Sequence, residues 1–139
     1  AVIPRGRSLV VDDDPAILDL AATVLGSASY DVSRARSGFE ALHLARRQRC
    51  DLVLLDINMP DMDGWETLRL FKADGEIRAL PVIMFSVKGE VRDKIHGMQE
   101  GAVDYLTKPF EVNDLLLRVQ RVLDRQDGDD APAGDAKGA

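Results

Sequence analysis

Polar side chains that can do chemistry follow four apolar runs of this sequence. They are Asp12, Asp13, Asp56, Ser86 and Lys108. Asp56 ends the run Leu52–Leu55, and an ionised carboxylate at the end of a buried strand is costly unless another group pairs with it. In an open parallel sheet, ligands bind at the carboxyl ends of the strands. Asp56 therefore has the position of a reactive or metal-binding group.

The mixture of carboxylates, a hydroxyl and an ammonium group predicts phosphoryl chemistry beside a metal ion. Neighbouring carboxylates repel one another, and a bound cation relieves that repulsion. No Cys or His accompanies them, so the expected ion is a hard divalent cation, Mg²⁺. A carboxylate oxygen can attack phosphorus to form an acyl phosphate. The metal and Lys108 would neutralise the transferring group, and Ser86 would donate a hydrogen bond to it.

Five predicted strands would bring these residues to one edge of a sheet. The strand candidates are Ser8–Val11, Asp31–Ala35, Leu52–Leu55, Val82–Phe85 and Val103–Leu106. The first, third and fourth are continuously apolar, as central parallel strands are, whereas Asp31–Ala35 is mixed and typical of an edge strand. With amphipathic helices between them, right-handed crossovers make this (βα)5 chain a doubly wound α/β sheet.

The predicted helices have recognisable starts and apolar stripes. Asp14 caps the first helix at Pro15, and Ser37 with Glu40 forms a capping box at the second. The third runs from about Trp65 to Lys72 and the fourth from about Val91 to Gln99. The fifth runs from about Val112 to Arg125. The expected buried stripes are Ile17, Leu20, Val24 and Leu25; Leu42 and Ala45; and Val112, Leu115, Leu116, Val119, Val122 and Leu123.

Composition narrows the classes of protein to consider. The chain has 139 residues, a net charge of -6 and one cysteine, Cys50. This acidity argues against direct nucleic-acid binding by this chain, and no apolar run approaches the roughly 20 residues that span a membrane. We expect a cytoplasmic protein with an N-terminal extension at 1–6, one domain at 7–125, and a disordered acidic tail or linker at 126–139.

Four motifs resemble the receiver domain of two-component response regulators. They are Val10-Val-Asp-Asp-Asp-Pro15, Leu55-Asp-Ile-Asn-Met-Pro-Asp-Met-Asp-Gly64, Pro81-Val-Ile-Met-Phe-Ser86 and Gly101-Ala-Val-Asp-Tyr-Leu-Thr-Lys-Pro-Phe110. One of them alone would be a weak sign, but four in order at the expected spacing are specific. The resemblance implies a flavodoxin-like fold with a parallel sheet in the order 2-1-3-4-5 and helices on both faces.

The resemblance also implies roles and partners. Asp56 would accept a phosphoryl group from a histidine kinase or histidine phosphotransfer protein, and Lys108 would pair with that group. Mg²⁺, or Mn²⁺ in its place, would bind the Asp13 and Asp56 carboxylates, the main-chain carbonyl of Asn58 and, through water, Asp12. Ser86 and Tyr105 would be the switch pair, and the Lys108–Pro109 bond would be cis. A homodimer and a downstream effector domain or protein are further partners that the resemblance allows.

Some residues depart from the family's pattern. Val87 stands where receivers usually have Ala or Gly, so we expect slower phosphotransfer from small donors such as acetyl phosphate, and Lys88 follows it. Val103 replaces an acidic residue common in regulators that dimerise through the fourth helix, fifth strand and fifth helix. Asp104 and Arg118 stay available for salt bridges in such a dimer.

Simpler interpretations apply to other residues. Asp61 and Asp63 are typical of a turn, His43 and His96 of a solvated surface, Cys50 of a structural thiol, and Trp65 of a partly packed ring. Three alternative functions stay open. The first is a haloacid dehalogenase-type hydrolase, a class that requires Asp at the position of Asn58. The second is a flavodoxin-like cofactor binder, which requires a phosphate-binding loop after the first strand. The third is a receiver module that acts by protein contact without phosphorylation. We expect a signalling switch and not a turnover enzyme.

Overall fold

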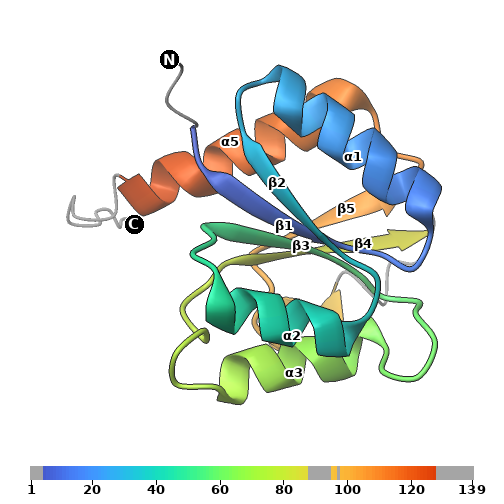
Figure 1. The fold of residues 1–139 in the computed structure, drawn as a ribbon, viewed down its shortest axis with the longest axis vertical. Helices are drawn as coiled ribbons and strands as arrows, with labels where there is room; N and C mark the ends of the chain where they lie inside the picture. Colours follow the sequence, from blue (N-terminus) through green and yellow to red (C-terminus); the bar gives the residue numbers. More distant parts are fainter. Residues whose placement is uncertain (1–4, 88–94, 97, 128–139) are drawn as a thin grey trace.

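Five parallel strands form one sheet with helices on both faces (Figure 1). The computed structural model describes residues 5–87, 95–96 and 98–127, without the side chains of Ser86, Val87, Gln126 and Asp127. Its elements are β1 (Arg7–Val11), α1 (Pro15–Ser27), β2 (Asp31–Ala35), α2 (Gly38–Arg47), β3 (Leu52–Asp56), α3 (Gly64–Ala73), β4 (Val82–Val87), β5 (Asp104–Lys108) and α5 (Val112–Asp127). The strand order is β2-β1-β3-β4-β5. The predicted fold class and order are confirmed.

The helices lie in two layers because the chain crosses over the sheet in both directions. Helices α1 and α5 cover one face, and α2 and α3 cover the other (Figure 1). Strand β3 is buried on both sides. Its Leu52 and Leu54 pack toward α1 and α5, whereas Val53 and Leu55 pack toward α2 and α3. This two-sided burial explains why β3 reads as an unbroken apolar run.

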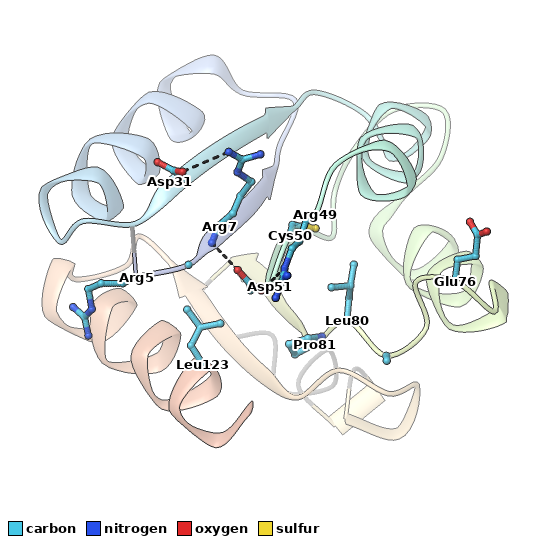
Figure 2. A pocket seen from close by; sticks show the side chains of 12 residues that line it. Arg5, Arg7, Asp31, Arg49, Cys50, Asp51, Glu76, Leu80, Pro81 and Leu123 are labelled. Atoms are coloured by element: carbon cyan, nitrogen blue, oxygen red, sulfur yellow. Dashed lines mark hydrogen bonds and ion pairs between the residues drawn. The ribbon is translucent and has the colours of Figure 1, made fainter. Parts of the chain in front are cut away.

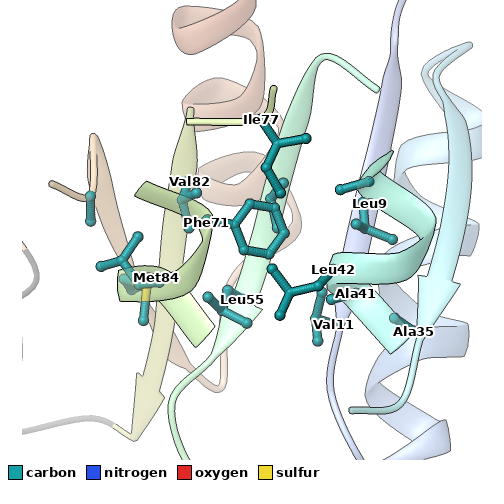
Figure 3. Close-up of a cluster of buried hydrophobic side chains, with 14 of the residues drawn as sticks. Leu9, Val11, Ala35, Ala41, Leu42, Leu55, Phe71, Ile77, Val82 and Met84 are labelled. Atoms are coloured by element: carbon teal, nitrogen blue, oxygen red, sulfur yellow. The ribbon is translucent and has the colours of Figure 1, made fainter. Parts of the chain in front are cut away.

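Phe71 is the largest fully buried side chain of the α2–α3 layer. Figure 3 shows its ring lying between Leu55 of β3 and Ile77, with Leu42 of α2 beside it. Thr67 and Leu68 of α3 are buried on the same side. This packing holds α3, and with it the loop that follows β3, against the sheet.

Several local predictions agree with the structure. The Asp14 side chain accepts a hydrogen bond from the backbone N–H of Ala16 and caps α1. Ser37 accepts one from the backbone N–H of Glu40 over 3.1 Å. Strand β2 lies at the sheet edge, and the Lys108–Pro109 bond is cis. A capping side chain bonds to a backbone N–H only two or three residues away, which is why the sequence alone locates the two caps. The cis bond was expected from the family resemblance.

Other predictions are corrected. Leu20 is 45% exposed and Val112 is 48% exposed, so neither belongs to the buried stripe of its helix. In α1 the buried side chains are Leu18, Ala21, Val24 and Leu25, and a residue two positions from Leu18 lies on the opposite side of a 3.6-residue turn. Strand β5 starts one residue later than predicted and extends to Lys108, because its ladder with β4 continues to the pair Val87 and Lys108.

The expected fourth helix falls largely on residues outside the described part of the chain. Of its predicted span, Ile95, His96, Met98 and Gln99 are described, and all are helical. Within the described ranges, no helix has the length and apolar character needed to cross a membrane.

Candidate functional site

Three carboxylates meet at the carboxyl ends of β1 and β3. Asp12 follows β1 directly and Asp56 ends β3, and the two strands are neighbours with Val11 opposite Leu55. One carboxylate oxygen from each of Asp12, Asp13 and Asp56 lies within 4.8 Å of the others. Asp12 and Asp56 are buried, at 0% and 2% exposure. The sequence therefore placed this cluster correctly, because adjacent parallel strands in register end at the same edge.

Lys108 joins the cluster from β5. Its Nζ donates to Asp12 Oδ2 over 2.7 Å and to Asp56 Oδ1 over 3.0 Å. The side chain thus reaches over β4, which lies between β5 and β3 in the sheet. Predicting Lys108 as a cation at this edge was right, but sequence reasoning did not reveal that one ammonium group would bridge two carboxylates.

Burial and charge give Asp56 an unusual protonation equilibrium. Burial, followed by the negative charge of Asp12, raises the pKa of Asp56 from 3.8 to about 6. Hydrogen bonding and charge from Lys108, and a hydrogen bond from the Asn58 backbone N–H, oppose that rise. Burial alone would lower the pKa of Lys108, but its bonds to Asp12 and Asp56 raise it. At neutral pH Asp56 is therefore largely ionised beside the ammonium group of Lys108.

Two aromatic rings that the sequence did not mark support the Lys108 side chain. The Lys108 Nζ lies 5.9 Å from the centre of the Phe85 ring. Phe85 is buried and stacks on Phe110, with 5.8 Å between ring centres and 4° between planes. Phe110 lies in the motif that contains Lys108, so its position was a signal, yet only the fold shows that it meets Phe85 of β4.

The loop after β3 packs closely on the first turn of α3. The backbone N–H of Gly64 donates to the Ile57 carbonyl over 2.8 Å. A Cβ on Gly64 would lie 2.3 Å from the backbone oxygen of Asp56, so only glycine allows this approach. Asp61 has a φ of 69°, which suits its predicted turn role. Asp63 does more than predicted, because its side chain caps α3 through the Glu66 N–H.

The proposed switch pair is only partly within the described structure. Ser86 lies in β4 with its backbone opposite Thr107 of β5, and its side chain lies outside the described part. Tyr105 is 5% exposed and packs in the α2–α3 layer. The switch role of both residues stays a prediction.

Several surface predictions change once the tertiary contacts are known. Arg118 pairs with Asp104 over 2.6 Å and with Asp114 over 2.9 Å, so these groups are engaged within the chain and a dimer would have to exchange their bonds. His96 was expected to be solvated, but its ring lies edge-on against Trp65 at 4.3 Å between centres. His43 is exposed, as predicted, and Trp65 is partly packed.

A separate cavity of about 690 Å³ lies at the opposite, amino-terminal edge of the strands. Figure 2 shows Arg7 there, bonded to Asp31 and Asp51. Cys50 also lines this cavity and is buried, and burial raises the pKa of its thiol to about 11. The thiol is thus neutral, in keeping with its predicted structural role. The cavity does not include the acidic cluster.

Comparison with protein families gives an independent result. A family model described as the response regulator receiver domain matches residues 8–120. The chain is 42% identical over 121 residues to the DNA-binding dual master transcriptional regulator RpaA of Synechocystis sp., covering 87% of this chain and 50% of that protein. It is 38% identical over 129 residues to the DNA-binding response regulator MtrA of Mycolicibacterium smegmatis, covering 93% and 54% respectively. This chain spans about half the length of these relatives.

Solved structures agree with the sequence relatives. A putative response regulator from Chloroflexus aurantiacus has a TM-score of 0.84 and 36% identity, covering 88% of this chain and all of that one. The chemotaxis response regulator CheY4 of Vibrio cholerae has a TM-score of 0.78 and 33% identity, covering 84% and 98% respectively. Both likenesses therefore cover most of this chain.

Proposed function

This chain belongs to the response regulator receiver domain family, and from that premise we propose that Asp56 accepts a phosphoryl group from a phosphohistidine. The observation that carries the proposal is the buried Asp56 carboxylate, held beside Asp12 and Asp13 and bonded to Lys108. The chain would act as a switch within a two-component system and not as a turnover enzyme. We assign the domain to residues 7–125 and its location to the cytoplasm.

The cluster suits Mg²⁺, or Mn²⁺ in its place. Asp12, Asp13 and Asp56 bring three carboxylates together, and Lys108 offsets the charge of only one. The donors are hard oxygens, which divalent Mg²⁺ prefers. Asp13 and Asp56 would hold the ion directly, Asn58 through its main-chain carbonyl, and Asp12 through water. When bound, the ion would neutralise negative charge on the phosphoryl oxygens.

Asp56 would act as the nucleophile and Lys108 as its electrostatic partner. An oxygen of the ionised Asp56 attacks phosphorus, the phosphorus–nitrogen bond of the phosphohistidine breaks, and the imidazole nitrogen leaves with the electron pair. With a pKa of about 6, the Asp56 carboxylate is largely ionised at neutral pH. Lys108 would move its hydrogen bond from the carboxylate to a phosphoryl oxygen, where negative charge develops.

The consequence of phosphorylation would be a population shift. Ser86 would bond to the phosphoryl group and Tyr105 would turn into the space left by the hydroxyl, changing the surface of the fourth helix, β5 and α5. That surface would bind a downstream effector domain, an effector protein or a second copy of the chain. The donor would be a histidine kinase or a histidine phosphotransfer protein.

Beryllofluoride tests the phosphoacceptor role because it mimics an aspartyl phosphate. With Mg²⁺ present, we expect the chain to bind one beryllofluoride, seen as bound signals in fluorine NMR, and Asp56→Asn to bind none. The exposed Asp61 in the same loop offers a control, since Asp61→Asn keeps the Asp56 oxygen and should bind as the parent does. If the parent chain binds no beryllofluoride at millimolar Mg²⁺, the proposal fails.

A further inference from the structure

One stripe of α3 contacts residues that precede β5. Trp65 meets His96, with 4.3 Å between ring centres and 85° between planes. One turn on, Arg69 Nη1 lies 3.8 Å from Glu100 Oε1. Lys72 packs against Gly101, whose added Cβ would lie 3.3 Å from Lys72 Cε. The α3 residues are spaced i, i+4 and i+7, so they lie on one face of the helix. We call these three contacts the α3 seam.

At its first residue the α3 seam is attached to the phosphoacceptor loop. Trp65 follows Gly64, and Gly64 lies so close to the Asp56 carbonyl that a Cβ would stand 2.3 Å from its oxygen. The Gly64 N–H to Ile57 carbonyl bond, at 2.8 Å, fixes the same junction. Because the two backbone segments are in close contact there, a shift of the backbone at Asp56 or Ile57 would displace the start of α3 and Trp65.

At its other side the α3 seam is attached to the start of β5. The Glu100 N–H donates to the His96 carbonyl over 2.9 Å, so these two residues belong to one helical turn. Gly101 follows with a φ of 109°, a conformation that favours glycine. The Val103 N–H then bonds to the Val82 carbonyl over 2.9 Å and starts the ladder between β4 and β5. Strand β5 leads on to Tyr105 and Lys108.

We propose that the α3 seam couples the state of Asp56 to the helical residues before β5, by a route separate from Ser86 and Tyr105. The proposal rests on the proposed phosphoacceptor function. The seam holds His96 and Glu100 against α3. A ligand on Asp56 displaces the Asp56 carboxylate and the backbone of the loop that follows it. This displacement moves the start of α3 and loosens the contact between Trp65 and His96. Coupling of this kind is reciprocal, so loosening the contact must also change ligand affinity.

A double-mutant cycle on beryllofluoride affinity tests the proposal. The variants are Trp65→Leu, His96→Leu and the pair together, measured by calorimetry on the whole chain with saturating Mg²⁺. Since the proposal is that a ligand on Asp56 loosens this contact, each single variant is expected to bind beryllofluoride about fivefold more tightly, a modest coupling. The double variant is expected to match the single ones, because either change removes the same contact.

Two further variants separate coupling from general damage. His96→Phe keeps a ring against Trp65 and is expected to restore the parent affinity. Phe39→Leu removes an aromatic ring that is 63% exposed on α2, outside the α3 seam, and is expected to leave affinity unchanged. In the parent, beryllofluoride should also shift the emission of Trp65, the single tryptophan of the chain, and the imidazole resonances of His96.

The outcomes distinguish this proposal from the one on which it rests. If the parent binds no beryllofluoride, the phosphoacceptor function fails and the coupling fails with it. If the parent binds but the leucine variants bind equally or more weakly, or their effects multiply in the double variant, the phosphoacceptor function stands and the α3 seam does not couple to Asp56.

Discussion

Asp56→Asn is expected to make the metal-free protein more stable above pH 6. Folding raises the pKa of Asp56 from 3.8 to about 6, so the folded chain holds a proton there that the unfolded chain has already lost. The protonated Asp56 carboxyl therefore contributes its full share to the unfolding free energy below about pH 4, and this contribution is lost as the pH rises through 6. A pKa difference of that size corresponds to at most about 3 kcal/mol.

Chemical denaturation of parent and variant at pH 4, 6 and 8 measures this effect. The difference in unfolding free energy is expected to be near zero at pH 4 and to approach about 3 kcal/mol at pH 8. Asp61→Asn, an exposed change in the same loop, should show no such trend. Mg²⁺ should stabilise the parent and not Asp56→Asn. A variant equal to or less stable than the parent at pH 8 would show that Lys108 fully compensates the buried charge.

Lys108→Met is expected to destabilise the metal-free protein by about 3 kcal/mol at pH 8. Methionine keeps much of the side-chain volume but removes the ammonium group that bonds to Asp12 over 2.7 Å and to Asp56 over 3.0 Å. Both carboxylates are buried, so they would face each other without a cation. Because Lys108 lowers the pKa of Asp56, that pKa should be higher in the variant. The penalty should therefore shrink as the pH falls from 8 toward 6, and it should also shrink when Mg²⁺ is added.

Lys72→Met is the matched control for that change. The Lys72 Nζ is also partly buried, but it donates to two neutral acceptors, the carbonyls of Arg78 and Leu80, each over 3.1 Å. We expect it to cost about 1 kcal/mol, because unpaired carbonyls are less costly than unpaired charges. Methionine keeps an aliphatic chain beside Gly101, so the seam contact stays and we expect Mg²⁺ to leave the loss unchanged. If both variants lose the same unfolding free energy and Mg²⁺ recovers neither loss, then Lys108 does not balance the charge of the two buried carboxylates. Thermal unfolding with and without Mg²⁺ measures both.

Most of the fold could be predicted because its signals are local. A strand buried on both faces needs apolar residues at every position, and Leu52–Leu55 shows that pattern. Helix caps act over three residues, so Asp14 and Ser37 were identified correctly. The apolar pattern was less reliable for predicting which side of a helix faces the sheet. Leu20 and Val112 were predicted to be buried, but both are largely exposed.

The candidate site divides in the same way. Asp12, Asp13, Asp56 and Lys108 could be placed together from sequence because parallel strands end at one edge. Which carboxylates pair with Lys108 could not be predicted from the sequence, since the pairing depends on how far the Lys108 side chain reaches across β4. The Phe85–Phe110 stack joins β4 to the residues after β5, and the Trp65–His96 contact joins α3 to the residues before β5. Neither pair has a spacing that a sequence pattern can mark.

By itself, the sequence determined which residues stand at the carboxyl ends of the strands, and so the chemistry that this edge can perform. Its apolar runs, caps and turn residues act within single helices, strands or turns. There, the regular backbone geometry determines how far apart two residues lie from their separation in the sequence. Only the tertiary structure decided that Lys108 bridges Asp12 and Asp56 and that α3 presses on His96 and Glu100. Those contacts depend on the distances between packed elements, which are set by the volumes of all the side chains buried between them.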